Sequence, residues 1–188
     1  MLAGGQARRL GGRDKSALAV GPASILERQL TVLRAITPHI LIVGGDPSHG
    51  QATGVPVVAD CVAGAGALGG LYSALVEAPT EQVLVIACDM PFLTAPFLSR
   101  LAALGADAEA AVPRDAHGPH PLCASYLRRV AGRLRARIDA GALRIIDALA
   151  DLEVRDMGPD ELAPFNEDGR LLLNVNSPDD HRRAQALE

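Results

Sequence analysis

The chain has 188 residues, with 48% hydrophobic and 21% charged side chains and a formal net charge of −4. The length predicts one domain with a sizeable core, and the acidic balance disfavours a nucleic-acid binder. The sequence shows neither an apolar run of the roughly 18 residues that span a membrane nor a signal peptide at its start, so we expect a cytoplasmic protein without membrane contact.

The first half alternates helix and strand signals. Ser24 and Glu27 form a capping box, and leucines at helical spacing extend from it to about Ala35. The segment 82–88 is apolar from Val83 to Cys88, as in a central parallel strand covered on both faces. Shorter strands are predicted at 39–43 and 55–59, a glycine-rich turn at 64–70, and helices at 71–77 and from Thr94 onward.

The second half is less regular. Strands are predicted at 108–112, 122–126, 152–157 and 171–175, a basic helix at 128–140 before Gly141, and a last helix opening at Ser177 and Pro178. Alternating strands and helices indicate an α/β fold with an open, mostly parallel sheet and helices on both faces. In such sheets ligands bind beyond the carboxyl ends of the strands.

The segment 2–15 contains two glycine pairs and four cationic side chains against one acidic one, a local charge of +3. Glycines let backbone amides approach a phosphate, and clustered cations suit a triphosphate. The pattern matches neither the P-loop nor the dinucleotide-binding fingerprint. A basic surface loop without a ligand is the alternative interpretation.

Two aspartates directly follow predicted strands. Asp89 comes after the central one, where a Mg²⁺ ligand for a bound triphosphate would lie, since Mg²⁺ uses one or two carboxylates and completes its shell with water and phosphate oxygens. Asp60 follows the 55–59 strand and could contact ribose, base or metal. Each could instead be an ordinary turn aspartate.

Other polar clusters favour structural interpretations. His117 and His120 stand among glycine and proline, which excludes the helix that would face both toward a metal, so a solvated loop or substrate rim is favoured. The arginines of the basic helix favour a solvated face over a surface for anionic substrate. Three cysteines without C-x-x-C spacing indicate reduced thiols rather than disulfides or zinc.

Taken together, these residues resemble the molybdenum cofactor guanylyltransferases, nucleotidyltransferases with a Rossmann-like fold of the nucleotide-diphospho-sugar-transferase type. The resemblance covers nearly the whole chain in order. It rests on Leu2-Ala3-Gly4-Gly5, Arg9-Leu10-Gly11-Gly12-Arg13-Asp14-Lys15, Asp60, the 66–70 turn, Cys88-Asp89-Met90-Pro91-Phe92-Leu93, His120-Pro121 and Asn174-Val175-Asn176-Ser177-Pro178.

The resemblance implies GMP transfer from GTP to the phosphate of molybdopterin, with release of pyrophosphate. Alternatives are cytidylyl or other nucleotidyl transfer to a phosphorylated acceptor, or a non-catalytic nucleotide-binding module. Molybdoenzyme maturation proteins are implied as transient partners. The single domain 1–188 would have a nucleotide-binding half at about 1–93 and an acceptor half at about 94–188.

The resemblance also assigns roles to individual residues. Asp89 would hold Mg²⁺ and act in catalysis with Arg9 and Lys15. The expected contacts are Leu2, Ala3, Gly4, Gly5, Lys15, Asp60 and Asp89 for the nucleotide, and Asn174 and Asn176 for the acceptor.

Three features depart from the family pattern. Only Met1 precedes Leu2, where a short strand is usual, so the first strand is expected to be missing or truncated. Val43-Gly44-Gly45 stands where members often carry a nucleotide-contacting Asn, and Gly66-Ala67-Leu68 stands in place of Gly-Pro-Leu.

Overall fold

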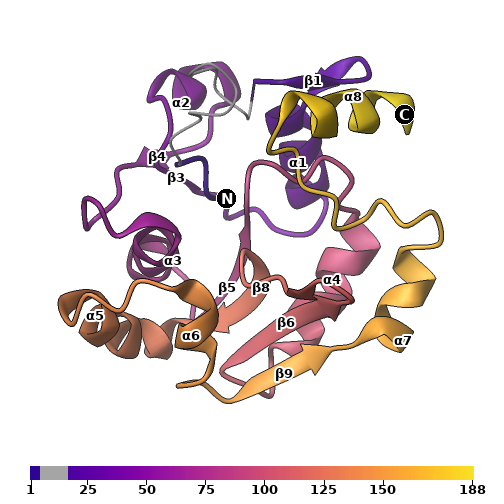
Figure 1. Cartoon of the computed structure of the whole chain (residues 1–188). Coiled ribbons are helices and arrows are strands. Elements are labelled where there is room, and N and C mark those ends of the chain that lie inside the picture. The colour runs from indigo at the N-terminus through magenta and orange to yellow at the C-terminus, as the bar shows by residue number, and fades with distance from the viewer. Residues whose placement is uncertain (5–16) are drawn as a thin grey trace.

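The computed structural model describes residues 1–4 and 17–188, which form a twisted mixed sheet between two layers of helices (Figure 1). The sheet is joined at Leu2, which makes parallel bridges to both Val43 and Ala87. On the Val43 side, β3 (Ile42–Val43) pairs in parallel with β4 (Val57–Val58). On the Ala87 side lies β5 (Gln82–Ile86), so β4, β3, Leu2 and β5 are parallel neighbours.

Beyond β5 the sheet changes direction. The strand β8 (Cys123–Leu127) is antiparallel both to β5 and to β6 (Ala110–Asp115). The strand β9 (Val154–Met157) then pairs in parallel with β6, while β7 (Gly118–Pro119) forms a hairpin with it. The predicted α/β class is therefore confirmed, with an antiparallel strand inserted that the sequence pattern did not indicate.

Helices cover both faces because side chains alternate along each strand. Val85 packs in one apolar cluster and Ile86 in the other. The first face is covered by α3 (Gly66–Glu77), α5 (Ala131–Asp139) and α6 (Ile145–Leu149), and the second by α1 (Ile25–Arg34), α4 (Ala95–Leu104) and α7 (Pro159–Leu162) (Figure 1).

The remaining elements are short or peripheral. A hairpin of β1 (Ala19–Val20) and β2 (Ala23–Ser24) precedes α1, and the last helix is α8 (Pro178–Ala186). The others are α2 (Ser48–Thr53) and the 3₁₀ turns η2 (Arg128–Val130) and η3 (Ala163–Phe165). Within the described residues no helix is long and apolar enough to cross a membrane.

The predicted capping box at Ser24 forms and Ser177 caps α8, whereas Thr94, where the helix after β5 was expected to start, is the N-cap residue of α4 without a side-chain hydrogen bond. Ser24 accepts from the backbone N–H of Glu27, whose carboxylate accepts from the Ser24 N–H in return. Ser177 and Asp180 make the same reciprocal pair at the start of α8. Gly141 ends the basic helix with a positive φ of 71°.

Two predictions of local structure were wrong. The segment 171–175 is a turn followed by extended chain, not a strand. Its apolar side chains pack into the hydrophobic clusters beside the sheet, while its backbone does not pair with a strand in the described residues. The helix predicted at 71–77 begins at Gly66, so the expected glycine turn forms its first turns. Gly70 of this helix faces Leu2, where a Cβ would lie 3.6 Å from the Leu2 Cδ1, an ordinary van der Waals contact.

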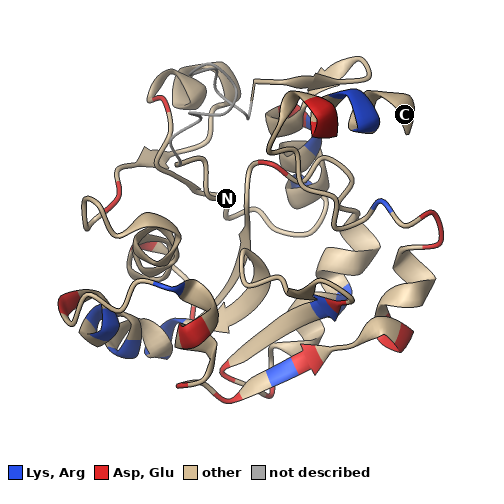
Figure 2. Ribbon diagram, in the orientation of Figure 1, with Lys and Arg blue, Asp and Glu red and all other residues tan. Residues whose placement is uncertain are grey.

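The arginines of α5, which are blue in Figure 2, pair with acidic side chains of the same chain. Arg133 pairs with Glu109, Arg137 with Asp151, and Arg135 with Asp139 one turn away at 2.9 Å. These ion pairs neutralise much of the helix and favour the solvated-face interpretation.

Glu109 shows how strongly one of these carboxylates is held. Bonds from the Arg133 guanidinium and the Glu153 N–H lower the pKa of Glu109 to about 2. An acid with a depressed folded-state pKa stabilises the fold above its unfolded pKa, and this contribution is lost as pH falls toward the folded value.

We predict that Glu109→Gln lowers the urea midpoint at pH 7, and that the difference from wild type shrinks steadily below about pH 4.5. Glu153→Gln removes the same charge from an exposed neighbour and serves as the control. A deficit in Glu109→Gln that stays constant from pH 7 to pH 3 would show that the charge is not what matters.

Candidate functional site

The parallel strands bring three chain segments to one edge of the sheet. Leu2 donates its N–H to Ile86 O at 2.8 Å, and Cys88 donates back to Leu2 O at 3.0 Å. On the other side, Ala3 donates to Val43 O at 2.9 Å. Gly4, the glycines after β3 and the turn after β5 therefore leave the sheet at the same end, where ligands of open α/β sheets bind.

The glycines that follow β3 are required by this close approach. Gly44 and Gly45 have φ of 71° and 78°, a region that side chains with Cβ rarely adopt. A Cβ on Gly44 would lie 2.9 Å from the Gly4 Cα, and one on Gly45 would lie 2.9 Å from the Ala3 Cβ. The glycines at Val43-Gly44-Gly45, where family members often carry an Asn, thus have a steric cause. A larger residue there would displace Ala3 and Gly4.

Asp60 lies beside this junction. Its carboxylate is 3.4 Å from where a Cβ of Gly4 would stand and 3.8 Å from that of Gly70 on α3. The residue is exposed overall, but partial burial against this backbone raises the pKa of its carboxyl. Asp60 can therefore receive hydrogen-bond donors from a ligand lying over Gly4.

Asp89 lies in the turn after β5 and is half-buried. Its backbone carbonyl accepts a 2.7 Å hydrogen bond from the N–H of Val175. Val175 stands between Asn174, which is half-buried, and Asn176, which is exposed. The structure therefore brings the segment expected to face the acceptor against the turn that carries the expected metal ligand, although the two are far apart in sequence.

Part of the expected site lies outside the described residues, namely Gly5, Arg9 and Lys15. Leu2 and Ala3 are buried in the sheet, so they can offer a ligand backbone more readily than side chain, whereas Gly4 is exposed.

The donor set of this edge suits a hard cation. Its candidate ligands are carboxylates, and the described residues contain no group of three or more His, Cys, Asp and Glu side chains that could hold a metal by themselves. Mg²⁺ and similar ions need only one or two carboxylates when phosphate oxygens and water complete the shell. Asp89 therefore fits such an ion bound together with a nucleotide.

Gln29 was missed by the sequence reasoning. It is 1% exposed, and it donates from Nε2 to Ala87 O at 2.7 Å and Met90 O at 3.0 Å, on either side of Asp89. The signal was present, because Gln29 occupies an apolar position of α1 in helical phase with Leu26 and Leu33. A polar residue on a buried helix face indicates a specific hydrogen-bonding need.

The two histidines both contact Asp115. His120 Nε2 lies 2.9 Å from Asp115 Oδ2, and the His117 N–H donates to Asp115 Oδ1 at 2.8 Å. Burial raises the pKa of Asp115, but these bonds outweigh it and the net shift is downward. These contacts stabilise the turn between β6 and β7.

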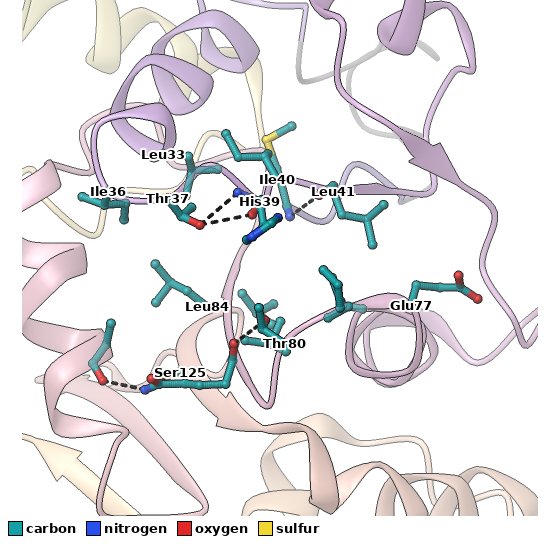
Figure 3. A pocket seen from close by; sticks show the side chains of 18 of the residues that line it. Leu33, Ile36, Thr37, His39, Ile40, Leu41, Glu77, Thr80, Leu84 and Ser125 are labelled. Atoms are coloured by element: carbon teal, nitrogen blue, oxygen red, sulfur yellow. Dashed lines mark hydrogen bonds between the residues drawn. The ribbon is translucent and has the colours of Figure 1, made fainter.

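A cavity of about 740 Å³ lies at the opposite end of the parallel strands (Figure 3). Met1, Leu41 and Leu84 line it, together with Ile36 and Ile40 after α1. Since these residues precede the carboxyl ends of β3 and β5, this cavity is separate from the edge that carries Asp60 and Asp89.

Comparison with known proteins shows the family of this chain. Residues 1–153 match the family model of the MobA-like NTP transferase domain. The chain is 35% identical over 204 residues to a molybdenum cofactor guanylyltransferase of Mesorhizobium japonicum, covering 100% of this chain and 93% of that protein.

Solved structures show the same fold. The crystal structure of molybdopterin-guanine dinucleotide biosynthesis protein A from Archaeoglobus fulgidus superposes with a TM-score of 0.84 at 26% identity, covering 99% of this chain and 95% of that one. A Mycobacterium tuberculosis protein crystallised with manganese has a TM-score of 0.66 at 24% identity, covering 98% and 95% of the two chains.

The contact between Gly44 and Gly4 can be tested by comparing Gly44→Ala with Gly54→Ala. Both glycines have φ near 70°, but a Cβ on Gly54 would meet nothing within 4 Å. Each variant should lose about 1–2 kcal/mol of unfolding free energy for the left-handed conformation, and Gly44→Ala should lose more because it also displaces Gly4. Equal losses in urea unfolding would contradict the close-approach account.

Proposed function

This chain belongs to the molybdenum cofactor guanylyltransferases, a family built on the MobA-like NTP transferase domain, and from that premise we propose that it transfers GMP from GTP to the terminal phosphate of molybdopterin, releasing pyrophosphate. One observation carries the assignment. Gly4, Asp60 and the Asp89 turn meet at one edge of the sheet, and the 174–176 segment is hydrogen-bonded to that turn.

The chemistry of the reaction fits these residues. The attacking group is a phosphate whose second pKa is about 6, so it is largely ionised at neutral pH without help from a general base. What the protein must supply is alignment of the acceptor with the α-phosphorus and stabilisation of negative charge. An edge built from glycine backbone and carboxylates, with a cationic segment beside it in sequence, is suited to that task.

The nucleotide would lie over the start of the chain. Leu2, Ala3, Gly4 and Gly5 would contact it through backbone, and Asp60 would accept hydrogen bonds from it. Lys15 and Arg9 would neutralise the triphosphate and the departing pyrophosphate. In this proposal residues of about 1–93 bind the nucleotide, and residues of about 94–188, with Asn174 and Asn176, bind the pterin acceptor.

We propose Mg²⁺ as the cofactor and Asp89 as its protein ligand. A bound divalent ion would supply charge neutralisation on the phosphate oxygens. The carboxylates of Asp60 and Asp89 at this edge, and a protein of the same fold that was crystallised with manganese, support a divalent ion here. A cytoplasmic location and hand-over of product to maturation proteins stay predictions from the sequence.

Asp89→Ala should reduce metal-dependent guanylyl transfer by about a hundredfold or more, since removing the ligand removes several kcal/mol of charge stabilisation. The rate of pyrophosphate release with GTP and molybdopterin measures this. Asp107→Ala, which removes an exposed acid after α4, should leave the rate unchanged. Near-normal turnover of a folded Asp89→Ala protein would refute the metal assignment.

Lys15 can be tested with unusual selectivity because it is the one lysine in the sequence. GTP with Mg²⁺ should protect it from amine acetylation, as followed by mass spectrometry. In calorimetry, Lys15→Ala should weaken GTP binding about tenfold or more, the value of a hydrogen bond to a charged group. Acetylation at the same rate with and without GTP would argue against a contact with the triphosphate.

A further inference from the structure

The buried side chain of Gln29 supports the turn that carries Asp89. Helix α1 packs its apolar face into the core through Leu26, Leu30 and Leu33, and Gln29 lies on that face with 1% of its surface exposed. An apolar residue of similar size would fill this position without burying a polar group. The amide must therefore be explained by what it contacts.

Its contacts lie on both sides of Asp89. The Nε2 amide donates to Ala87 O at 2.7 Å and to Met90 O at 3.0 Å, so both of its protons are used. The neighbouring Arg28 donates from Nε to Pro91 O at 3.1 Å. Helix α1 thus holds the turn through three backbone carbonyls, while the Asp89 carbonyl is bonded to the Val175 N–H.

The oxygen of the Gln29 amide, Oε1, makes no comparable hydrogen bond among the described residues. The Oε1 atom is buried, and none of the described residues donates a hydrogen bond to it. A glutamine that was merely buried in the core would have hydrogen-bond partners for both the nitrogen and the oxygen of its amide. Gln29 instead directs its donors at two carbonyls of one turn.

We propose that Gln29 is a positioning residue that fixes the backbone from Ala87 to Met90, so that the Asp89 carboxylate is presented to the divalent ion of the bound nucleotide. The inference rests on the proposed function, because it assigns Gln29 a role only if Asp89 is a metal ligand. Residues that orient a ligand in this way commonly change metal affinity by 10–100-fold when they are replaced.

The chain offers a matched control in Gln82. Its Nε2 also donates to two acceptors, Ala102 O at 2.6 Å and Ser125 Oγ at 3.0 Å, but at the opposite end of β5. Gln29→Met and Gln82→Met therefore each remove a doubly donating amide beside β5, at opposite ends of that strand. They differ in whether the lost bonds support Asp89.

Mn²⁺ binding in the presence of GTP, measured by electron paramagnetic resonance, provides a readout that does not depend on turnover. Gln29→Met should bind Mn²⁺ about tenfold more weakly than wild type, and Gln82→Met should bind it as wild type does, although both melt at lower temperature. Gln29→Asn, which keeps the amide but is one methylene shorter, should show the same loss and serves if the Met variant does not fold.

Measuring Asp89→Asn in the same experiment distinguishes a failure of the positioning role of Gln29 from a failure of the assignment of Asp89 as metal ligand. If Asp89→Asn loses Mn²⁺ affinity while both Gln29 variants keep it, the positioning role is wrong and the metal assignment stands. If Asp89→Asn binds Mn²⁺ as wild type does, the metal assignment itself is wrong, and the role of Gln29 falls with it.

Discussion

The pairing of Leu2 with two strands at once is the constraint on which the rest of the structure depends. Its backbone is bonded to Ile86 and Cys88 on one side, and its neighbour Ala3 is bonded to Val43 on the other. Without this joint, β3 and β4 would have no hydrogen-bonded connection to β5 in the described sheet. The same joint places Gly4 at the edge where Asp60 and Asp89 lie, so the contacts that connect the sheet also position the site.

A second set of contacts connects the C-terminal helix α8 and the 174–176 segment to the β1–β2 hairpin. Arg28 donates to Val20 O in the β1–β2 hairpin at 3.1 Å and pairs with Glu188 at 2.8 Å. From α8, His181 Nε2 lies 2.6 Å from Ala19 O. Val175 and Phe92 share an apolar cluster with residues of the hairpin, α1 and α8. The C-terminal helix therefore connects the 174–176 segment, the turn that carries Asp89 and the β1–β2 hairpin.

The sequence predicted features whose cause is local. The capping box at Ser24, the helix start at Ser177 and the apolar strand β5 follow from neighbouring residues, and they formed as expected. The positions of Asp60 and Asp89 could also be expected, because polar residues after parallel strands gather at one edge. The 171–175 prediction failed because apolar residues in extended chain look alike whether they pair with a strand or pack on helices.

Features that depend on distant contacts could not be predicted. The expectation of a missing or truncated first strand did not indicate that Met1–Ala3 would hold the position between β3 and β5, which depends on both partners. Likewise, the sequence shows at Val43-Gly44-Gly45 only that the nucleotide-contacting Asn of the family is absent. The need for glycine at position 44 comes from its approach to Gly4, a distant contact. The antiparallel direction of β8 is set by where the chain returns to the sheet, which no periodicity encodes.

The central claim is that this edge binds GTP and joins its α-phosphate to a phosphorylated pterin. GTP and CTP labelled at the α-phosphate, each offered with molybdopterin and Mg²⁺, test it most directly. The account predicts that label from GTP appears in a dinucleotide product in step with pyrophosphate release, and that CTP gives little product. Transfer of label from CTP in preference to GTP, or no transfer from either, would contradict it.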